Sequence, residues 1–213
     1  VQDDLTVTDD MTVGGTLGVT GVLTGTSLDI SGDIDVDGTT NLDVVDIDGA
    51  VDMASTLTIG GAINGVTIKA DTTNFINSIL ISQNASTGTL SSADNNTGLG
   101  DSVFAALTSG TQNIAIGQSA GLSLTEGIRN TIVGALAADA MTDADNNEAF
   151  GYGALSSNVL GSRSTAIGTA ALLTQNPSTA TNMYNVAVGY EAGLSISTGL
   201  ANTIIGGLAG DAI

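Results

Sequence analysis

Acidic side chains are the residues of this 213-residue chain whose type and spacing point most directly to chemistry. In the first 69 residues they recur two positions apart, as in the pairs Asp35/Asp37 and Asp46/Asp48. Side chains two apart on a β-strand point to the same side, and carboxylate oxygens are the ligands that Ca²⁺ prefers. Two interpretations stay open, a calcium site on these four carboxylates or a solvated acidic face that keeps sheets apart, and the pattern favours the second.

The composition excludes the commonest catalytic and metal-binding groups. The chain has no His and no Cys, so histidine acid–base catalysis and His or Cys metal sites are ruled out. No Ser/His/Asp set or paired-carboxylate site can be assembled, and the Gly-rich stretch 13–15 lacks the Lys of a phosphate loop. A hexapeptide-type acyltransferase would suit the repeats described below, but such enzymes typically need a catalytic His. We therefore expect neither an enzyme nor a cofactor.

The charge balance limits the possible partners. Three basic residues against 22 acidic ones give a net charge of −19, which disfavours nucleic acid and anionic membrane surfaces as partners. A hydrophobic content of 42% argues against a disordered chain. An aromatic content of only 3%, with 29 Gly, argues against one large globular core. No apolar run approaches the roughly 20 residues of a membrane span.

Residues 1–69 follow a six-residue period. Apolar residues come in pairs spaced two apart, such as Leu5/Val7 and Met11/Val13, and glycines mostly occupy the fifth position of each hexad. Each hexad predicts a very short strand followed by a bend. Three hexads of one chain could form one turn of a left-handed β-helix, or three chains could each supply one face of a β-prism. Slips near residues 23–28 and 38–45 break a strict 18-residue turn and favour the trimeric prism.

Residues 96–213 carry a different repeat, Asn-x-Φ-Φ-Gly, in which Φ is apolar or small. It starts at Asn96, Asn113, Asn130, Asn147, Ser164, Asn185 and Asn202 and ends at Gly100, Gly117, Gly134, Gly151, Gly168, Gly189 and Gly206. The steps are 17 residues, with one step of 21. A fixed period indicates stacked units. Each unit predicts a short strand, a glycine bend and a polar return, adding one rung of about 4.8 Å to a β-roll.

Positions within the repeat have different expected roles. The repeated Asn side chains could be sugar ligands, but the pattern favours turn caps or stacked amide ladders. We expect Ile116 to face inward and Gln118 to face outward. The residue after each glycine varies freely, which predicts an outward position, and Tyr152 and Tyr190 occupy it. Both are speculative receptor contacts, as is the loop around Pro177 in the 21-residue unit; an ordinary repeat surface is the simpler interpretation.

Residues 70–95 follow neither period. The stretch 75–81 within them is the strongest continuous apolar run of the chain. We expect a connector whose strands seal the junction between the two kinds of repeat. The predicted organisation is a shaft over 1–69, this connector over 70–95 and a β-roll over 96–213.

The repeat resembles those of bacteriophage tail fibres, most plainly over Asn113–Gly121 and Asn185–Leu194. It is similar also to the head repeats of trimeric autotransporter adhesins, although those units are usually shorter than 17 residues. Hexads such as Leu57–Gly61 look like the shafts of phage fibres. The resemblance implies an elongated, β-rich, parallel homotrimer.

These observations predict an all-β fold, with a trimeric β-prism or triple β-helix shaft followed by a stacked β-roll. The expected function is a structural segment of a virion tail fibre that projects or forms a host-attachment element. Its expected partners are copies of itself and other fibre or baseplate proteins, with a host-surface glycan or protein as candidate receptor. The alternative is a stalk or head of a trimeric adhesin on a bacterial surface. An ice-binding face is disfavoured, because Thr is not kept in register across the hexads.

Overall fold

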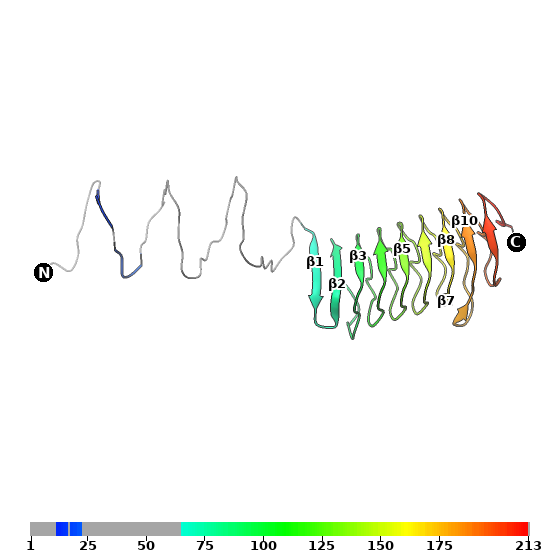
Figure 1. Cartoon of the computed structure of the whole chain (residues 1–213), viewed down its shortest axis with the longest axis horizontal. Helices are drawn as coiled ribbons and strands as arrows, with labels where there is room; N and C mark the ends of the chain where they lie inside the picture. Colours follow the sequence, from blue (N-terminus) through cyan, green and yellow to red (C-terminus); the bar gives the residue numbers. More distant parts are fainter. Residues whose placement is uncertain (1–11, 17, 23–64, 213) are drawn as a thin grey trace. The chain divides into compact units, whose positions relative to one another are not determined.

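The computed structural model of the chain describes residues 12–16, 18–22 and 65–212. The chain divides into two units, Val1–Ala54 and Ser55–Ile213. Nearly all of the described residues belong to the second unit, in which β1 to β11 lie (Figure 1). Most of the hexad shaft predicted over 1–69 lies outside the described residues. The same is true of its four calcium candidates, Asp35, Asp37, Asp46 and Asp48.

The second unit is an all-β solenoid of about seven turns, as the 17-residue repeat predicts. Its main sheet has nine strands in the order β1-β2-β3-β4-β5-β6-β8-β10-β11 (Figure 1). The seven repeat strands are β3 (Thr97–Leu99), β4 (Ile114–Ile116), β5 (Thr131–Val133), β6 (Glu148–Phe150), β8 (Thr165–Ile167), β10 (Val186–Val188) and β11 (Thr203–Ile205). They are parallel and in register, so each residue pairs with its equivalent one coil later.

A β-hairpin covers the first coil. Strand β1 (Thr67–Thr72) pairs with β2 (Phe75–Ser82) in antiparallel fashion, and β2 then pairs with β3 in parallel. Phe75 and Leu80 of this hairpin are fully buried. The segment predicted as a connector therefore contains a hairpin that closes one end of the solenoid, and its first strand begins three residues before the predicted boundary.

Within each repeat strand only the middle residue points into the coil. The buried middle residues are Gly98, Ala115, Ile132, Ala149, Ala166, Ala187 and Ile204. The expectation for Ile116 is therefore wrong, because this side chain is 38% exposed. Asn113 and Ala115 both point inward and lie two apart, so the alternation of a strand turns Ile114 and Ile116 outward.

Rung-to-rung hydrogen bonds hold the rest of each coil as well as the sheet. On the side opposite the strands, the backbone N–H of Ala106 donates to the carbonyl of Leu122 over 3.1 Å, and that of Gly121 to Ala137 over 3.0 Å. At Thr108 the N–H donates to Thr125 over 3.0 Å. The coils are thus fixed around their circumference at the spacing of a parallel sheet.

A second sheet, of two short strands, marks the 21-residue unit. Strand β7 (Gly161–Ser162) pairs in parallel with β9 (Thr181–Asn182), one coil later. Three of the four extra residues of this unit enter between the buried Gln175 and β9, and the fourth enters between β9 and β10. The in-register pairing of the main sheet continues across them.

Candidate functional site: an exposed apolar row

The repeated Asn side chains form a ladder inside the solenoid. Asn130 donates through Nδ2 to Asn113 Oδ1 over 3.1 Å and to the carbonyl of Ala144 over 2.8 Å. Its own Oδ1 accepts the backbone N–H of Asn147 over 2.9 Å. Asn96, Asn113, Asn130, Asn147 and Asn185 are all fully buried, so none of them is accessible to a sugar. Their hydrogen bonds replace the contacts with water that these amides lose on burial.

Ser164 interrupts this ladder, and Gln175 bridges the gap. The Oε1 atom of Gln175 accepts from Ser164 Oγ over 3.1 Å and from Asn185 Nδ2 over 2.9 Å. Its Nε2 donates to Asn158 Oδ1 over 3.3 Å. In most other coils the position of Gln175 is apolar, for example Leu124, but one coil earlier it is the buried Asn158. The long amide side chain therefore reaches the place where a shorter Ser leaves a donor without a partner.

Removing this bridge should destabilise the fold by an amount that depends on Ser164. Gln175→Leu is expected to cost about 2 kcal/mol, because buried donors on Ser164 and Asn185 lose an acceptor. In a protein that already carries Ser164→Asn, Gln175→Leu should cost less than about 1 kcal/mol, because the new amide at position 164 can accept a hydrogen bond from Asn185. Urea unfolding of the two single variants and the double variant measures this coupling. Additive losses would contradict the bridging role.

An apolar row runs along the outer face of the sheet. It consists of the last strand residue of each coil, namely Leu99, Ile116, Val133, Phe150, Ile167, Val188 and Ile205. Five of these side chains are 37–71% exposed, and Val133 and Val188 are half-buried. Scattered exposed apolar residues are normal on proteins, whereas a contiguous apolar surface usually marks an interaction site. We call this set the apolar row.

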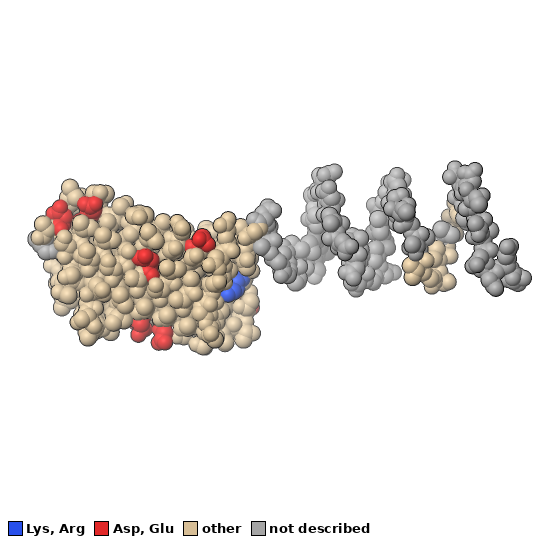
Figure 2. Space-filling view, turned by 180° about the vertical axis from the view of Figure 1, so that it is seen from behind, with Lys and Arg blue, Asp and Glu red and all other residues tan. Residues whose placement is uncertain are grey.

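The row beside it is also almost free of charge. The first strand residues are Thr97, Ile114, Thr131, Glu148, Thr165, Val186 and Thr203, of which only Glu148 is ionisable. The Glu148 carboxylate accepts a hydrogen bond from Thr165 Oγ1 over 2.9 Å. On the face shown in Figure 2 the acidic side chains are spread over the surface rather than gathered in one cluster. The two outward rows of strand residues thus carry a single ionisable side chain, that of Glu148.

The three speculative receptor contacts differ in their exposure. Tyr152 and Tyr190, which follow motif glycines, are 58% and 56% exposed. A hydrogen bond to the Glu191 carboxylate, with the charge of that group, raises the pKa of Tyr190 above its usual value, so the phenol stays neutral at pH 7. Pro177 is buried, and any contact from its loop would come from the exposed residues 178–180.

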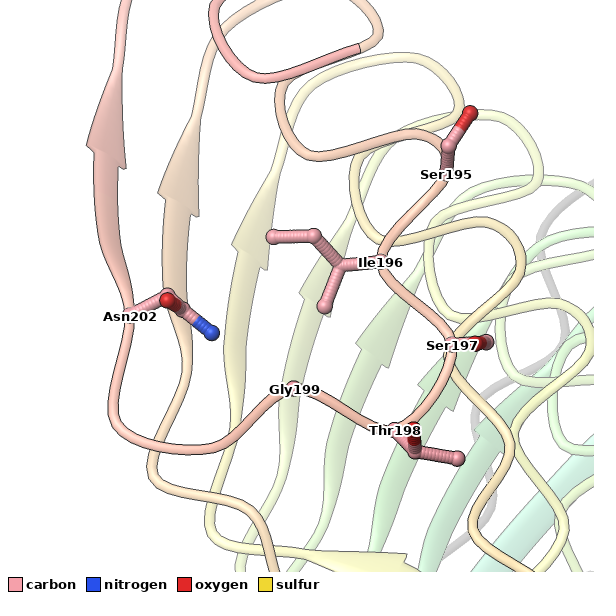
Figure 3. Close-up of a pocket in the computed structure, with 6 residues that line it drawn as sticks. All are labelled: Ser195, Ile196, Ser197, Thr198, Gly199 and Asn202. Atoms are coloured by element: carbon pink, nitrogen blue, oxygen red, sulfur yellow. The ribbon is translucent and has the colours of Figure 1, made fainter. Parts of the chain in front are cut away.

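A cavity of about 370 Å³ opens at the last described coil. It is lined by Ser195, Ile196, Ser197, Thr198, Gly199 and Asn202 (Figure 3). In earlier coils the next coil covers the equivalent surface, as where Gly110 meets the carbonyl of Gly127. The cavity is therefore the surface of the last described coil that, in earlier coils, is covered by the next coil. The amide side chain that points into it belongs to the ladder residue Asn202.

Within residues 65–212 and the short described stretches before them, no three Asp or Glu side chains come together in a way that could hold a metal ion. The same residues contain no helix of the length and apolarity that crossing a membrane requires. The surface feature that stands out in the described part of the chain is the apolar row. Comparison of the chain with protein-family models, with curated proteins and with solved structures found no match.

Proposed function

We propose that this chain is a structural fibre segment that assembles with copies of itself into a parallel homotrimer. In this proposal it belongs to a virion tail fibre, where it joins other fibre or baseplate proteins and projects or forms a host-attachment element. The observation that carries the proposal is the apolar row. Every coil contributes one apolar side chain to it, and in a single chain this row is exposed to solvent.

Burial of the apolar row would offset much of the free-energy cost of assembly. Burying seven partly exposed apolar side chains is worth roughly 1 kcal/mol each, about half the value for a fully exposed one. The gross gain of about 7 kcal/mol per chain lies within the range of the costs of association, which are about 4–15 kcal/mol. Apolar contacts from more than one face, or from other parts of the chain, would tip the balance toward a stable oligomer.

A copy of the same chain is the partner that the geometry of the row fits best. Successive side chains of the row are one rung apart, about 4.8 Å, and an in-register copy has the same spacing. When two parallel copies bring their apolar rows together, the neighbouring row of first strand residues contributes only one charged side chain per copy to the contact, that of Glu148. Residues 65–213 carry ten acidic and three basic side chains, a net charge of −7 that opposes close contact elsewhere on the solenoid.

The solenoid itself suits a spacer. Each coil contacts mainly its neighbours, so length grows with copy number while the cross-section stays constant. Backbone hydrogen bonds around the whole coil make such a rod stiff. An adhesin stalk or head on a bacterial surface needs the same properties and is the second candidate. Neighbouring genes for virion structural proteins would favour the fibre, and a fused membrane anchor would favour the adhesin.

Charges placed on the two faces of one strand test the assembly face. Ile116→Asp should leave the coil folded but convert the trimer to monomers at micromolar concentration, because the charge is desolvated only in the interface. Gln118→Asp, one residue beyond the motif glycine, should stay trimeric. Ala115→Asp should unfold the solenoid, because this side chain is fully buried within one chain. Sedimentation gives the mass, and circular dichroism reports folding.

The same experiment can overturn the proposal. A folded wild-type chain that sediments as a monomer at all concentrations would exclude self-assembly through any face. A trimer that survives Ile116→Asp would exclude the apolar row as its interface. To test attachment, the purified chain is added to host cells before infection. Blocked infection would place the receptor site within these residues, whereas no competition would leave the chain a passive spacer.

A further inference from the structure

A second exposed row alternates large and small side chains from coil to coil. It consists of the residues that directly follow the motif glycines, Asp101, Gln118, Ala135, Tyr152, Thr169, Tyr190 and Gly207. Tyr152 and Tyr190 are both more than half exposed, and the exposed Thr169 lies on the rung between them. Large exposed aromatic side chains are typical anchors of binding surfaces, because the ring is apolar and the hydroxyl is polar.

The spacing of the two rings is set by the backbone. Strands β6, β8 and β10 stack in parallel and in register, which places Tyr152, Thr169 and Tyr190 on successive rungs. Two rungs separate the tyrosines by about 9.6 Å along the solenoid axis. That length is close to one disaccharide unit of an extended β-linked polysaccharide. In such a chain every second sugar presents the same face.

The chemistry around the rings indicates an uncharged ligand. The carboxylate of Glu191, which directly follows Tyr190, can supply an acceptor for a sugar hydroxyl. Thr169 can donate to and accept from the sugar that lies between the rings. Residues 65–213 carry ten acidic and three basic side chains, and their net charge of −7 would repel an acidic polymer but has little effect on a neutral one.

We propose that Tyr152, Thr169 and Tyr190 form a platform for an extended, uncharged, β-linked polysaccharide. The glycan lies along the solenoid axis, with alternate sugars stacked on the two rings and the middle sugar hydrogen-bonded to Thr169. The platform lies beyond the glycine bend, outside the strands that carry the apolar row. This proposal names the ligand class of the host-attachment function, and in that respect it rests on the proposed function.

Calorimetric titration of the full chain with defined oligosaccharides tests the platform. The probes are cellohexaose, β-1,4-mannohexaose and chitohexaose, with cellobiose as a ligand too short to cover both rings. At least one hexasaccharide should bind, and cellobiose should bind at least tenfold more weakly. Tyr152→Ala and Tyr190→Ala should each weaken hexasaccharide binding about tenfold, because each removes one stacked ring.

Tyr184→Ala is the matched control, because Tyr184 is 56% exposed but lies in a different row. Its binding should equal that of the wild type. Failure of all three hexasaccharides, or an equal loss in Tyr184→Ala, would overturn the platform. Tighter binding of a hyaluronan hexasaccharide would overturn the assignment to an uncharged glycan. Sedimentation of the same samples reports the trimer separately, so loss of glycan binding and failure of assembly are distinguishable.

Discussion

Gly117→Ala is expected to destabilise the solenoid by about 3 kcal/mol or more. Gly117 has φ of 130°, a region that side chains with a Cβ rarely adopt, which costs about 1–3 kcal/mol. A Cβ there would also lie 2.6 Å from the carbonyl carbon and 2.7 Å from the oxygen of Gly134 on the next coil. Since backbone atoms cannot move aside as a side chain can, overpacking adds about 1–3 kcal/mol.

Gly206→Ala separates the two contributions to that loss. Gly206 has nearly the same φ, 126°, but its nearest atom to a new Cβ is Ala209 Cβ at 3.7 Å, because no described coil stacks on it. We expect a loss of about 1–2 kcal/mol from backbone strain alone. In thermal unfolding, the midpoint temperature of Gly117→Ala should lie about 10 °C below that of the wild type, and that of Gly206→Ala should be lowered by roughly half as much. Equal shifts would mean that contact between coils is not what requires glycine.

Asn130→Leu is expected to cost about 4 kcal/mol, the second large effect. The change keeps a similar side-chain volume but removes an amide with four hydrogen bonds to neighbouring coils. The backbone N–H of Asn147, one hydrogen of its amide and the carbonyl of Ala144 then lose their partner. Each buried unsatisfied group costs about 1–3 kcal/mol. Urea unfolding at equilibrium measures the total.

Asn202→Leu is the matched control at the end of the ladder. Its Nδ2 donates to Asn185 Oδ1 over 3.0 Å, and in the described part of the chain no further coil lies on its other side. We expect a loss of about 1 kcal/mol, that of a single hydrogen bond. If the two variants lose the same stability, the ladder contributes through each Asn separately and not through the stacked arrangement.

The sequence alone determined the units of this fold and their number. Seven recurrences of Asn-x-Φ-Φ-Gly predict seven coils, because an in-register parallel stack repeats the same environment at the same position of each unit. The same argument identifies the glycine bend, at which all seven glycines have φ between 126° and 142°. It also gives the position of the outward row that contains Tyr152 and Tyr190, since only an outward position tolerates free variation.

The tertiary structure decided which apolar side chains form the core. Periodicity marks Ala115 and Ile116 alike as apolar, and only the inward direction of Asn113 fixes which of them is buried. A buried Asn could not be recognised without its partners, because an amide is as common on surfaces as in ladders. For the same reason no sequence pattern indicates that Gln175 substitutes for the missing amide at Ser164, since the two side chains meet only because the chain curves around one coil between them. Composition and period thus determine that the coils stack. The alternation of inward and outward side chains along each three-residue strand determines which apolar residues are exposed.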